Sequence, residues 1–342
     1  MKLFVGLDVS LAKTWFCVIS EHGKIIKEAE TESAPEALAH WLDDLDGSIA
    51  AIGLEAGPMS HWLHRGLAEA GHDAVLMETR QIKGALKAMP IKTNRRDAEG
   101  IARLLHLGWF RPVHCKSVSA HETRAVLGAR KAIQQNMIAL EMSLIGLFRD
   151  FGLKVGAISR GRFETRIREL AEGNPMLETA TTAMLRARAS LRQKLAGLKK
   201  HVRRLAGDDS VCRRLMRMPG IGAVVALTFR AAVDDPTRFR SSKRGDPWVG
   251  LTPSRLQSGE GDVLGGITKA GDFNLRRAVC QAATVMMNRG RSTWLRTWGA
   301  QLAQRRGRKV AMVALARRIA VILHRIWVDG TAFQPDAAPN LA

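Results

Sequence analysis

The chain contains no tyrosine among its 342 residues, and aromatic residues make up only 5% of it. The missing phenol excludes any enzyme that forms a covalent phosphotyrosine intermediate, so a covalent link to a phosphate group would have to use serine or threonine. Cysteine is also scarce, and the four residues show neither zinc-ligand nor redox spacing. We expect Cys17, Cys115, Cys212 and Cys280 to be small packed thiols in a reducing compartment.

Long apolar runs are missing as well. The most apolar late stretch, residues 310–323, is interrupted by Arg317 and Arg318, and no signal peptide opens the sequence. These absences argue against a membrane role and predict a cytoplasmic protein.

Positive charge is abundant. Lysine and arginine number 53 against 32 aspartate and glutamate residues, which gives a formal net charge of +21 and a pI near 10.8. Such a surplus favours a polyanionic partner such as nucleic acid, because binding releases condensed counterions. The length and the 46% hydrophobic content are sufficient for about two domains, each with its own core.

Three carboxylates lie at the end of a predicted strand or at the start of a predicted helix. Asp8 lies at the end of an alternating apolar strand, Glu55 ends a second apolar run at 49–55, and Asp97 opens a helix after Lys92. Carboxylate oxygens suit Mg²⁺ or Mn²⁺, and phosphodiester chemistry uses one or two such ions to activate the attacking oxygen and neutralise the leaving one. The pattern therefore predicts a metal site that needs no catalytic histidine or cysteine.

The first ninety or so residues predict a mixed sheet. Period-2 or continuous apolar runs and helical spacing give the order βββαβαβα. The expected strands are 3–9, 14–20, 24–30, 49–55 and 72–78, and the expected helices are 35–45, 60–70 and the sequence from 80 onward. This is the order of ribonuclease-H-like folds, in which the first and fourth strands are neighbours. It would bring Asp8 beside Glu55, with Asp97 leaning over the same edge of the sheet.

The remainder of the chain predicts mostly helix. Residues 119–151 read as one long amphipathic helix, and residues 160–206 as a helical hairpin or coiled coil. Further helices are expected at 272–289 and 308–328, after a loop-rich segment at 248–271. The fold class is thus α/β plus α. The predicted domains are a catalytic domain at 1–152, a helical coiled-coil segment at 153–207 and a mostly helical domain at 208–342.

A short glycine motif lies near the start of the last domain. Pro219-Gly220-Ile-Gly222 precedes an apolar helix at 223–233 and resembles a helix-hairpin-helix. In that motif Gly220 and Gly222 would let backbone N–H groups approach a phosphate. Tight packing between helices is an equally good interpretation of the same glycines.

Several motifs together resemble a known family. They are Gly6-Leu-Asp8-Val-Ser, Glu55-Ala-Gly, Lys92-Thr-Asn-Arg-Arg-Asp97-Ala, and the late Ser258-Gly, Ile267-Thr-Lys-Ala-Gly and Leu275-Arg-Arg blocks. The chain is similar over essentially its whole length to the DEDD transposases of bacterial insertion sequences of the IS110 type. The resemblance implies a RuvC-like N-terminal domain, a coiled-coil segment and a C-terminal transposase domain with a nucleophilic serine.

The resemblance also implies partners and a reaction. It implies a nucleoid-associated recombinase that acts on donor and target DNA, guided by a non-coding bridge RNA, through a transient phosphoserine link and with Mg²⁺ or Mn²⁺ as the cofactor. Strand exchange involves four strand ends, so a homo-oligomer, either a dimer or a tetramer, is expected.

Residue by residue, the resemblance places Asp8, Glu55 and Asp97 on the first, second and fourth acidic positions of the family. The third falls on Asn94, where the family usually has aspartate. An asparagine carbonyl can coordinate a hard cation but brings no negative charge. The nucleophile position falls on Ser258, in a glycine-rich stretch where serine alone would more often be turn chemistry.

Basic residues cluster around both predicted sites and offer phosphate contacts, although such runs are also typical of a solvated surface. They are Lys92, Arg95 and Arg96 around Asp97, and Lys269, Arg276 and Arg277 after Ser258.

Three other functions fit parts of the sequence. A metal-only nuclease or junction resolvase would use water as nucleophile and leave Ser258 structural. An actin-like sugar or acetate kinase matches Asp8-Val-Ser-Leu-Ala-Lys13, but a second glycine-rich phosphate motif is missing and the positive charge is too high. A transposase relative disabled at Asn94 would only bind nucleic acid.

Overall fold

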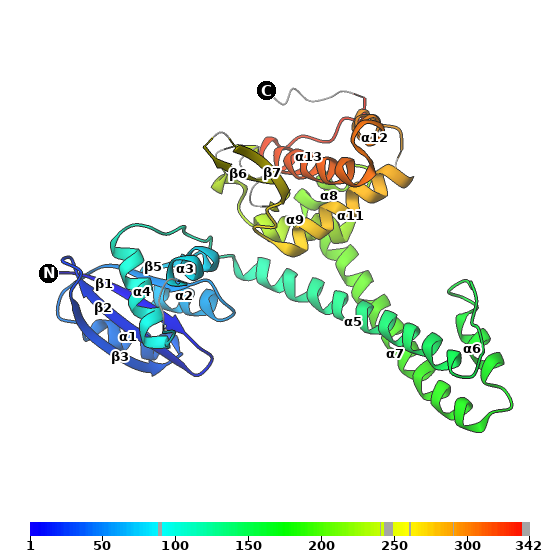
Figure 1. Cartoon of the computed structure of the whole chain (residues 1–342), viewed down its shortest axis with the longest axis horizontal. Coiled ribbons are helices and arrows are strands. Elements are labelled where there is room, and N and C mark those ends of the chain that lie inside the picture. Colours follow the sequence, from blue (N-terminus) through cyan, green and yellow to red (C-terminus); the bar gives the residue numbers. More distant parts are fainter. Residues whose placement is uncertain (88–90, 240, 243–248, 260, 290, 337–342) are drawn as a thin grey trace. The chain divides into compact units, whose positions relative to one another are not determined.

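The computed structural model describes residues 1–87, 91–239, 241–242, 249–259, 261–289 and 291–336. Contacts divide the chain into two compact units, Met1–Lys116 and Ser117–Ala342. Each unit is described by itself (Figure 1). The division differs from the predicted boundaries at 152 and 207, because the long helix after residue 117 packs with the helices that follow it. The predicted division into three domains therefore stays a prediction.

The first unit is a mixed α/β structure. Its strands are β1 (Lys2–Val9), β2 (Lys13–Ser20), β3 (Ile25–Glu32), β4 (Ser48–Glu55) and β5 (Ala74–Met77). Its helices are α1 (Pro35–Asp43), α2 (Ser60–Glu69), α3 (Thr79–Leu86) and α4 (Asn94–His106). The five strands form one sheet in the order β3-β2-β1-β4-β5.

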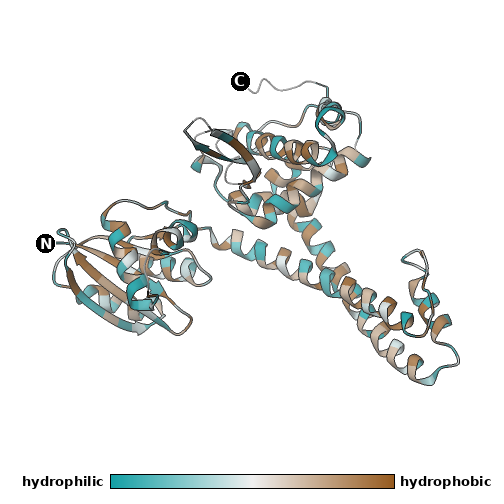
Figure 2. Ribbon diagram, viewed as in Figure 1, coloured by the Kyte–Doolittle hydropathy of each residue, from teal (hydrophilic) through white to brown (hydrophobic). Residues whose placement is uncertain are grey.

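The pairing of β1 sets the position of the acidic residues. β1 runs antiparallel to β2 and parallel to β4, so the predicted neighbourhood of the first and fourth strands is confirmed. Leu3, Val5 and Leu7 alternate on one face and are completely or almost completely buried in the core with α1 and α2. Figure 2 shows the hydrophobic residues concentrated in the middle strands, while the edge strand β3 is largely hydrophilic.

A glycine lets α4 lie directly on the other face of the sheet. A Cβ atom built on Gly6 would fall 2.2 Å from the carbonyl oxygen of Ala98 and 2.4 Å from the backbone nitrogen of Ala102. Real Cβ atoms essentially never come this close to backbone, so only glycine fits at this position. The first residue of the Gly6-Leu-Asp8 motif therefore determines how closely α4 approaches Asp8.

The second unit is almost wholly helical. Its helices are α5 (Val118–Arg149), α6 (Phe163–Ala171), α7 (Pro175–Asp208), α8 (Ser210–Leu215), α9 (Ala223–Val233), the 3₁₀ turn η1 (Pro236–Arg238), α11 (Phe273–Arg289), α12 (Trp294–Arg306) and α13 (Arg308–Asp329). Two strands, β6 (Pro253–Ser258) and β7 (Gly261–Ile267), form an antiparallel hairpin.

The two longest helices pack side by side and carry α6 at their far end (Figure 1). Residues 160–206, predicted to form a helical hairpin or coiled coil, contain α6 and nearly all of α7, which pack on each other, and the main partner of α7 is α5. A buried ion pair joins them, because Arg188 Nε lies 2.7 Å from Glu141 Oε1 and the guanidinium stacks over Phe163. The predicted long helix at 119–151 is confirmed as α5.

Two predictions for the C-terminal region need correction. The predicted loop at 248–271 contains the β6–β7 hairpin, although residues 248 and 260 lie outside the described residues. Its strands carry few apolar residues and are exposed on nearly every position, so the sequence lacks the alternation that marks a half-buried strand. Helix α12 was also missed, because only Leu295 and Gly299 on it are buried and the apolar stripe is weak.

None of the four cysteines forms a disulfide; Cys17 and Cys212 are buried and the other two are half-buried. Burial raises the pKa of the Cys17 thiol to about 12, so this thiol stays protonated and inert. Within the described ranges, no helix is both long and apolar enough to cross a membrane.

Candidate active site

Asp8 carries the clearest electrostatic signal of the first unit. It lies near the end of β1, paired with Trp15 on β2, and its side chain is only partly exposed. Its pKa is raised from the ordinary value of 3.8 to about 6, first by burial and then by the negative charges of Asp97 and Glu55, while Lys92 lowers it. A partly buried carboxylate held against two others in this way is typical of functional sites.

Glu55, at the end of the neighbouring strand β4, lies at the same height in the sheet as Asp8. Leu7 pairs with Leu54 in the parallel register of β1 and β4, so the next residues along, Asp8 and Glu55, lie side by side. Lys83 of α3 lies against this carboxylate, with Nζ 3.7 Å from Oε1. Sequence reasoning missed Lys83, because nothing in the local sequence distinguishes it from other surface lysines.

Asp97 comes from the first turn of α4. Thr93 caps the helix, because its side-chain oxygen accepts a hydrogen bond from the backbone nitrogen of Arg96 at 3.3 Å. Asp97 gains from the positive end of the helix dipole, and Lys92 Nζ lies 3.8 Å from its carboxylate. The close approach of α4 at Gly6 is what brings this carboxylate within electrostatic reach of Asp8.

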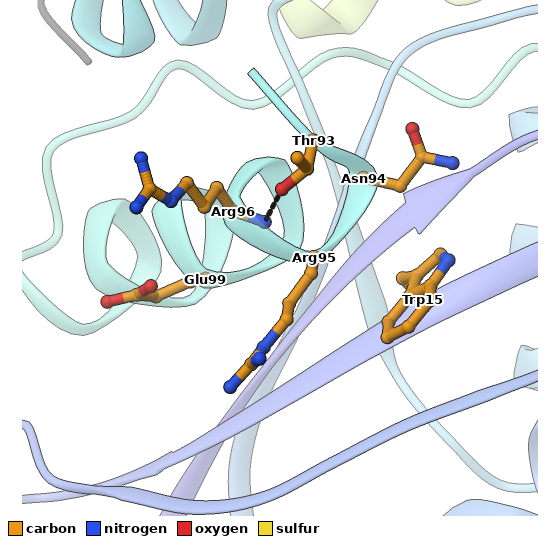
Figure 3. A pocket seen from close by; sticks show the side chains of 6 residues that line it. All are labelled: Trp15, Thr93, Asn94, Arg95, Arg96 and Glu99. Carbon is orange, nitrogen blue, oxygen red and sulfur yellow. Dashed lines mark hydrogen bonds between the residues drawn. The ribbon is translucent and has the colours of Figure 1, made fainter. Parts of the chain in front are cut away.

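Asn94 occupies the exposed first position of α4. Three residues before Asp97, it shares the same side of the helix, while Figure 3 shows it extending away from Arg96. The carboxamide lines an open recess of about 780 Å³ together with Trp15, which lies beside Asp8 across the β1–β2 pair. Trp15 is a second residue that sequence reasoning missed, since it sits in an ordinary alternating strand.

The donor set fits a hard divalent cation in its chemistry. Asp8, Glu55 and Asp97 offer only oxygen ligands, and the pKa of Asp8 is raised by burial and also by the negative charges of the other two. No three acidic, histidine or cysteine side chains among the described residues lie close enough to surround an ion. Lys83 and Lys92 instead neighbour two of the carboxylates, and both are long, exposed side chains that can turn away.

The arginines around Asp97 differ from one another. Arg95 is engaged by Glu28 of β3, with Nε donating to Oε1 at 2.8 Å and a second bond from the other guanidinium nitrogen. Arg96 and Arg95 both line the recess beside Asn94, and neither touches Asp97 in a described ion pair. Arg96 is therefore the more available of the two for a phosphate.

Ser258 lies in the second unit, at the last position of β6. It pairs with Gly261 across the turn of the hairpin, and its side chain is exposed. Arg255 and Asp262 pin the two strands together by a bidentate ion pair with both bonds at 2.7 Å. The serine hydroxyl thus lies at the tip of a hairpin and not in an irregular loop. It is exposed at this tip, so bulky side chains do not surround it.

The remaining predicted phosphate contacts have mixed surroundings. Arg276 donates to the backbone carbonyls of Val249 and Ala270, so it holds the chain next to the hairpin. Lys269 has a positive φ of 54° and donates its backbone N–H to Gly250. Arg277, near the start of α11, is exposed.

The two glycines of the short motif also have different roles. Gly220 has a φ of +85°, and a Cβ there would lie 2.9 Å from the carbonyl oxygen of Ala282, which supports the helix-packing interpretation. Gly222 precedes α9 and has open space where a Cβ would be, so its backbone is accessible.

Two family models match the chain. A DEDD-type transposase model of the IS110 group covers residues 5–152, and the model described as the transposase IS116/IS110/IS902 family covers residues 212–298. The first match contains the acidic residues and Asn94, and the second contains Ser258.

Relatives align over most of their length. The chain is 27% identical over 341 residues to the transposase for insertion sequence element IS1111A of Coxiella burnetii, covering 94% of this chain and 89% of that protein. It is 28% identical over 346 residues to a probable family 20 transposase of Pseudomonas aeruginosa, covering 97% and 98%. With both family models in their expected order and such relatives along the whole length, the chain belongs to the IS110/IS116 family of insertion-sequence transposases.

Proposed function

We propose that this protein catalyses metal-dependent DNA cleavage and strand exchange for an insertion sequence, through a transient phosphoserine link. Membership of the transposase family gives DNA transposition as the general activity. The observation that carries the finer proposal is the convergence of charge on Asp8, whose pKa is raised to about 6 by burial and by Asp97 and Glu55. The strand order of the first unit supports a ribonuclease-H-like, RuvC-type domain.

Asp8, Glu55 and Asp97 are the residues that would hold Mg²⁺ or Mn²⁺, with the Asn94 carbonyl as a neutral fourth ligand. A bound ion would polarise a phosphodiester oxygen and offset charge on the leaving oxygen. The chain's own part is to supply excess negative charge on a rigid sheet edge. Lys83 and Lys92 offset part of that charge where they lie against Glu55 and Asp97.

Ser258 supplies the attacking oxygen in this proposal. Its hydroxyl oxygen forms the new bond to phosphorus while the bond from phosphorus to the deoxyribose oxygen breaks, and the proton lost by the serine is balanced by the proton that the leaving deoxyribose oxygen gains as it becomes a free hydroxyl. The exposed tip of the β6–β7 hairpin leaves room for a phosphate group to approach, which supports this role.

The partners follow from the same family. We propose donor and target DNA as substrates, a non-coding guide RNA from the same element, and a homodimer or homotetramer as the active form. The net charge of +21 supports nucleic-acid binding but gives no selectivity by itself.

Trapping the covalent intermediate tests the nucleophile. Parent protein incubated with element-end DNA and Mg²⁺ should give a protein–DNA adduct on denaturing gels, and Ser258→Ala should give none while retaining DNA affinity. Ser254→Ala is the matched control, because Ser254 lies on the same strand and its hydroxyl is bonded to the carbonyl of Gly266. Cleavage without any adduct in the parent protein would favour a metal-only nuclease, and an undiminished adduct in Ser258→Ala would move the nucleophile elsewhere.

Competition tests the guide RNA. The protein should bind structured RNA of its own element more tightly than unrelated RNA of equal length at physiological salt. Equal affinity would remove the guide from the proposal and leave DNA binding intact.

A further inference from the structure

A groove on the second unit is lined by helices that come from distant parts of the sequence. It has a volume of about 940 Å³ and lies among α5, α7, the start of α9 and α11. These four helices pack on one another, so the groove belongs to one compact unit.

The charge of the groove is entirely of one sign. Six basic residues line it, and no aspartate or glutamate is among the described residues that do so. They are Arg124, Arg130, Lys131, Lys199, Arg203 and Arg277. Such a surface repels cations and attracts a polyanion.

Internal partners account for only part of this charge. Arg124 is bound by Asp272 at 2.5 Å, and Lys131 donates to the side-chain oxygen of Asn274 at 3.0 Å. Across the portion of the chain that the structure describes, Lys199, Arg203 and Arg277 form no ion pair, and all three are exposed. They are therefore available to an external anion.

Arg130 adds a buried, unpartnered donor atom to the groove. Its guanidinium donates to Gln134, but its Nε atom is buried and has no hydrogen-bond partner in the structure. A partly buried cation without an acid beside it costs free energy that a bound phosphate would offset.

The start of α9 contributes backbone donors to the same groove. Gly222 precedes the helix without a capping side chain, no acidic residue lies in its first turn, and residues 222–225 line the groove. The positive end of the helix dipole is thus directed toward the same space as the exposed cations.

We propose that this groove binds the sugar-phosphate backbone of duplex DNA and anchors the substrate away from the residues that react. The proposal rests on the proposed function for its choice of DNA as the polyanion. The cations come from three helices rather than from one point, which suits a continuous phosphate backbone better than a single small anion. Phosphate contacts of this kind position a duplex without reading its sequence.

Fluorescence anisotropy with a duplex of unrelated sequence tests the groove on the full-length protein. The triple variant Lys199→Gln, Arg203→Gln and Arg277→Gln removes three exposed charges. The matched control is Arg186→Gln, Arg192→Gln and Lys194→Gln, which removes the same charge from exposed positions on α7 outside the groove. Unchanged thermal melting of both triples shows that they fold, and a Lys199→Arg, Arg203→Lys and Arg277→Lys variant keeps the charge.

The groove triple should bind the duplex roughly 10- to 100-fold more weakly near 150 mM salt, and the slope of log affinity against log salt should fall by roughly 2.7. The control triple and the charge-preserving variant should stay within about 2-fold of the parent. Equal weakening in the groove and control triples would overturn the proposal, as would a loss confined to RNA. Strand exchange is scored separately: a parent that binds through the groove but never exchanges strands contradicts the proposed function and leaves the groove standing.

Discussion

The acidic centre of the first unit and the serine hairpin of the second are built in opposite ways. Asp8 and Glu55 lie on adjacent strands of a five-stranded sheet, and α4 is pressed against that sheet at Gly6. Ser258 ends a two-stranded hairpin on which Leu256 and Val263, paired across the strands, are 75% and 62% exposed.

The difference shows where each site obtains its geometry. The carboxylates are positioned by a core that exists without substrate, at the cost of bringing like charges together. A two-stranded hairpin is only marginally stable alone, and this one buries few of its own side chains, so its geometry depends less on a preformed core. The folded sheet holds the carboxylates of the first unit in place, whereas Ser258 lies on an exposed hairpin.

The largest expected effect comes from removing charge at Asp8. Asp8→Asn should abolish DNA cleavage, because the central carboxylate of the site is lost, and should raise the melting temperature. The pKa of Asp8 is higher in the folded protein, so the folded state binds more protons than the unfolded state between pH 3.8 and about 6. The free energy of unfolding of the parent therefore falls as pH rises through that range.

Thermal melting across pH measures this effect. The stabilisation by Asp8→Asn should be greatest above pH 6 and should vanish below about pH 4, where Asp8 is protonated in both states. A destabilised Asp8→Asn protein at pH 7 would mean that the carboxylate is structural.

The second-largest effect is expected when one glycine in each region is replaced by alanine. Gly6→Ala should destabilise the protein by about 1–3 kcal/mol, because the new Cβ meets backbone atoms of α4. Gly266→Ala on β7 is the matched change, since nothing lies within 4 Å of a Cβ there, and it should stay within about 0.5 kcal/mol. Urea unfolding of both variants gives the comparison, and similar midpoints would remove the contrast between a packed and an open site.

The smallest expected effect concerns Asn94. Asn94→Asp adds a negative charge on the side of α4 that carries Asp97 and should lower the Mg²⁺ concentration for half-maximal strand exchange several-fold. Replacing Mg²⁺ by Mn²⁺ should reduce the difference in metal requirement between the parent and Asn94→Asp, because Mn²⁺ tolerates less ideal ligands. Asn136→Asp, an exposed position on α5, is the control for added charge. An unchanged metal requirement in Asn94→Asp would place this residue outside the set of ligands.

The sequence was sufficient for the acidic centre because its geometry follows from strand order. Once β1 and β4 are recognised as neighbours, Asp8 and Glu55 must meet, and the capped start of α4 supplies Asp97. Lys83 and Trp15 could not be found in this way, since their closeness to the acids depends on three-dimensional packing alone.

The second unit was harder to predict. The hairpin around Ser258 buries almost nothing, so it leaves no hydrophobic period to detect, and α12 has too few buried residues to show one. The partner of α7 was missed because α5 is separated from it by a connecting segment and a short helix. Resemblance to a family, rather than local pattern, singled out Ser258.

The paired helices α5 and α7 also give the second unit a fixed length. With 32 and 34 residues, each spans roughly 50 Å at 1.5 Å per residue. That length corresponds to about one and a half turns of B-form DNA. Because α5 packs against α7 and the Arg188–Glu141 pair fixes their register, a change in length that keeps the same faces in contact has to come in steps of about seven residues, or about 10 Å.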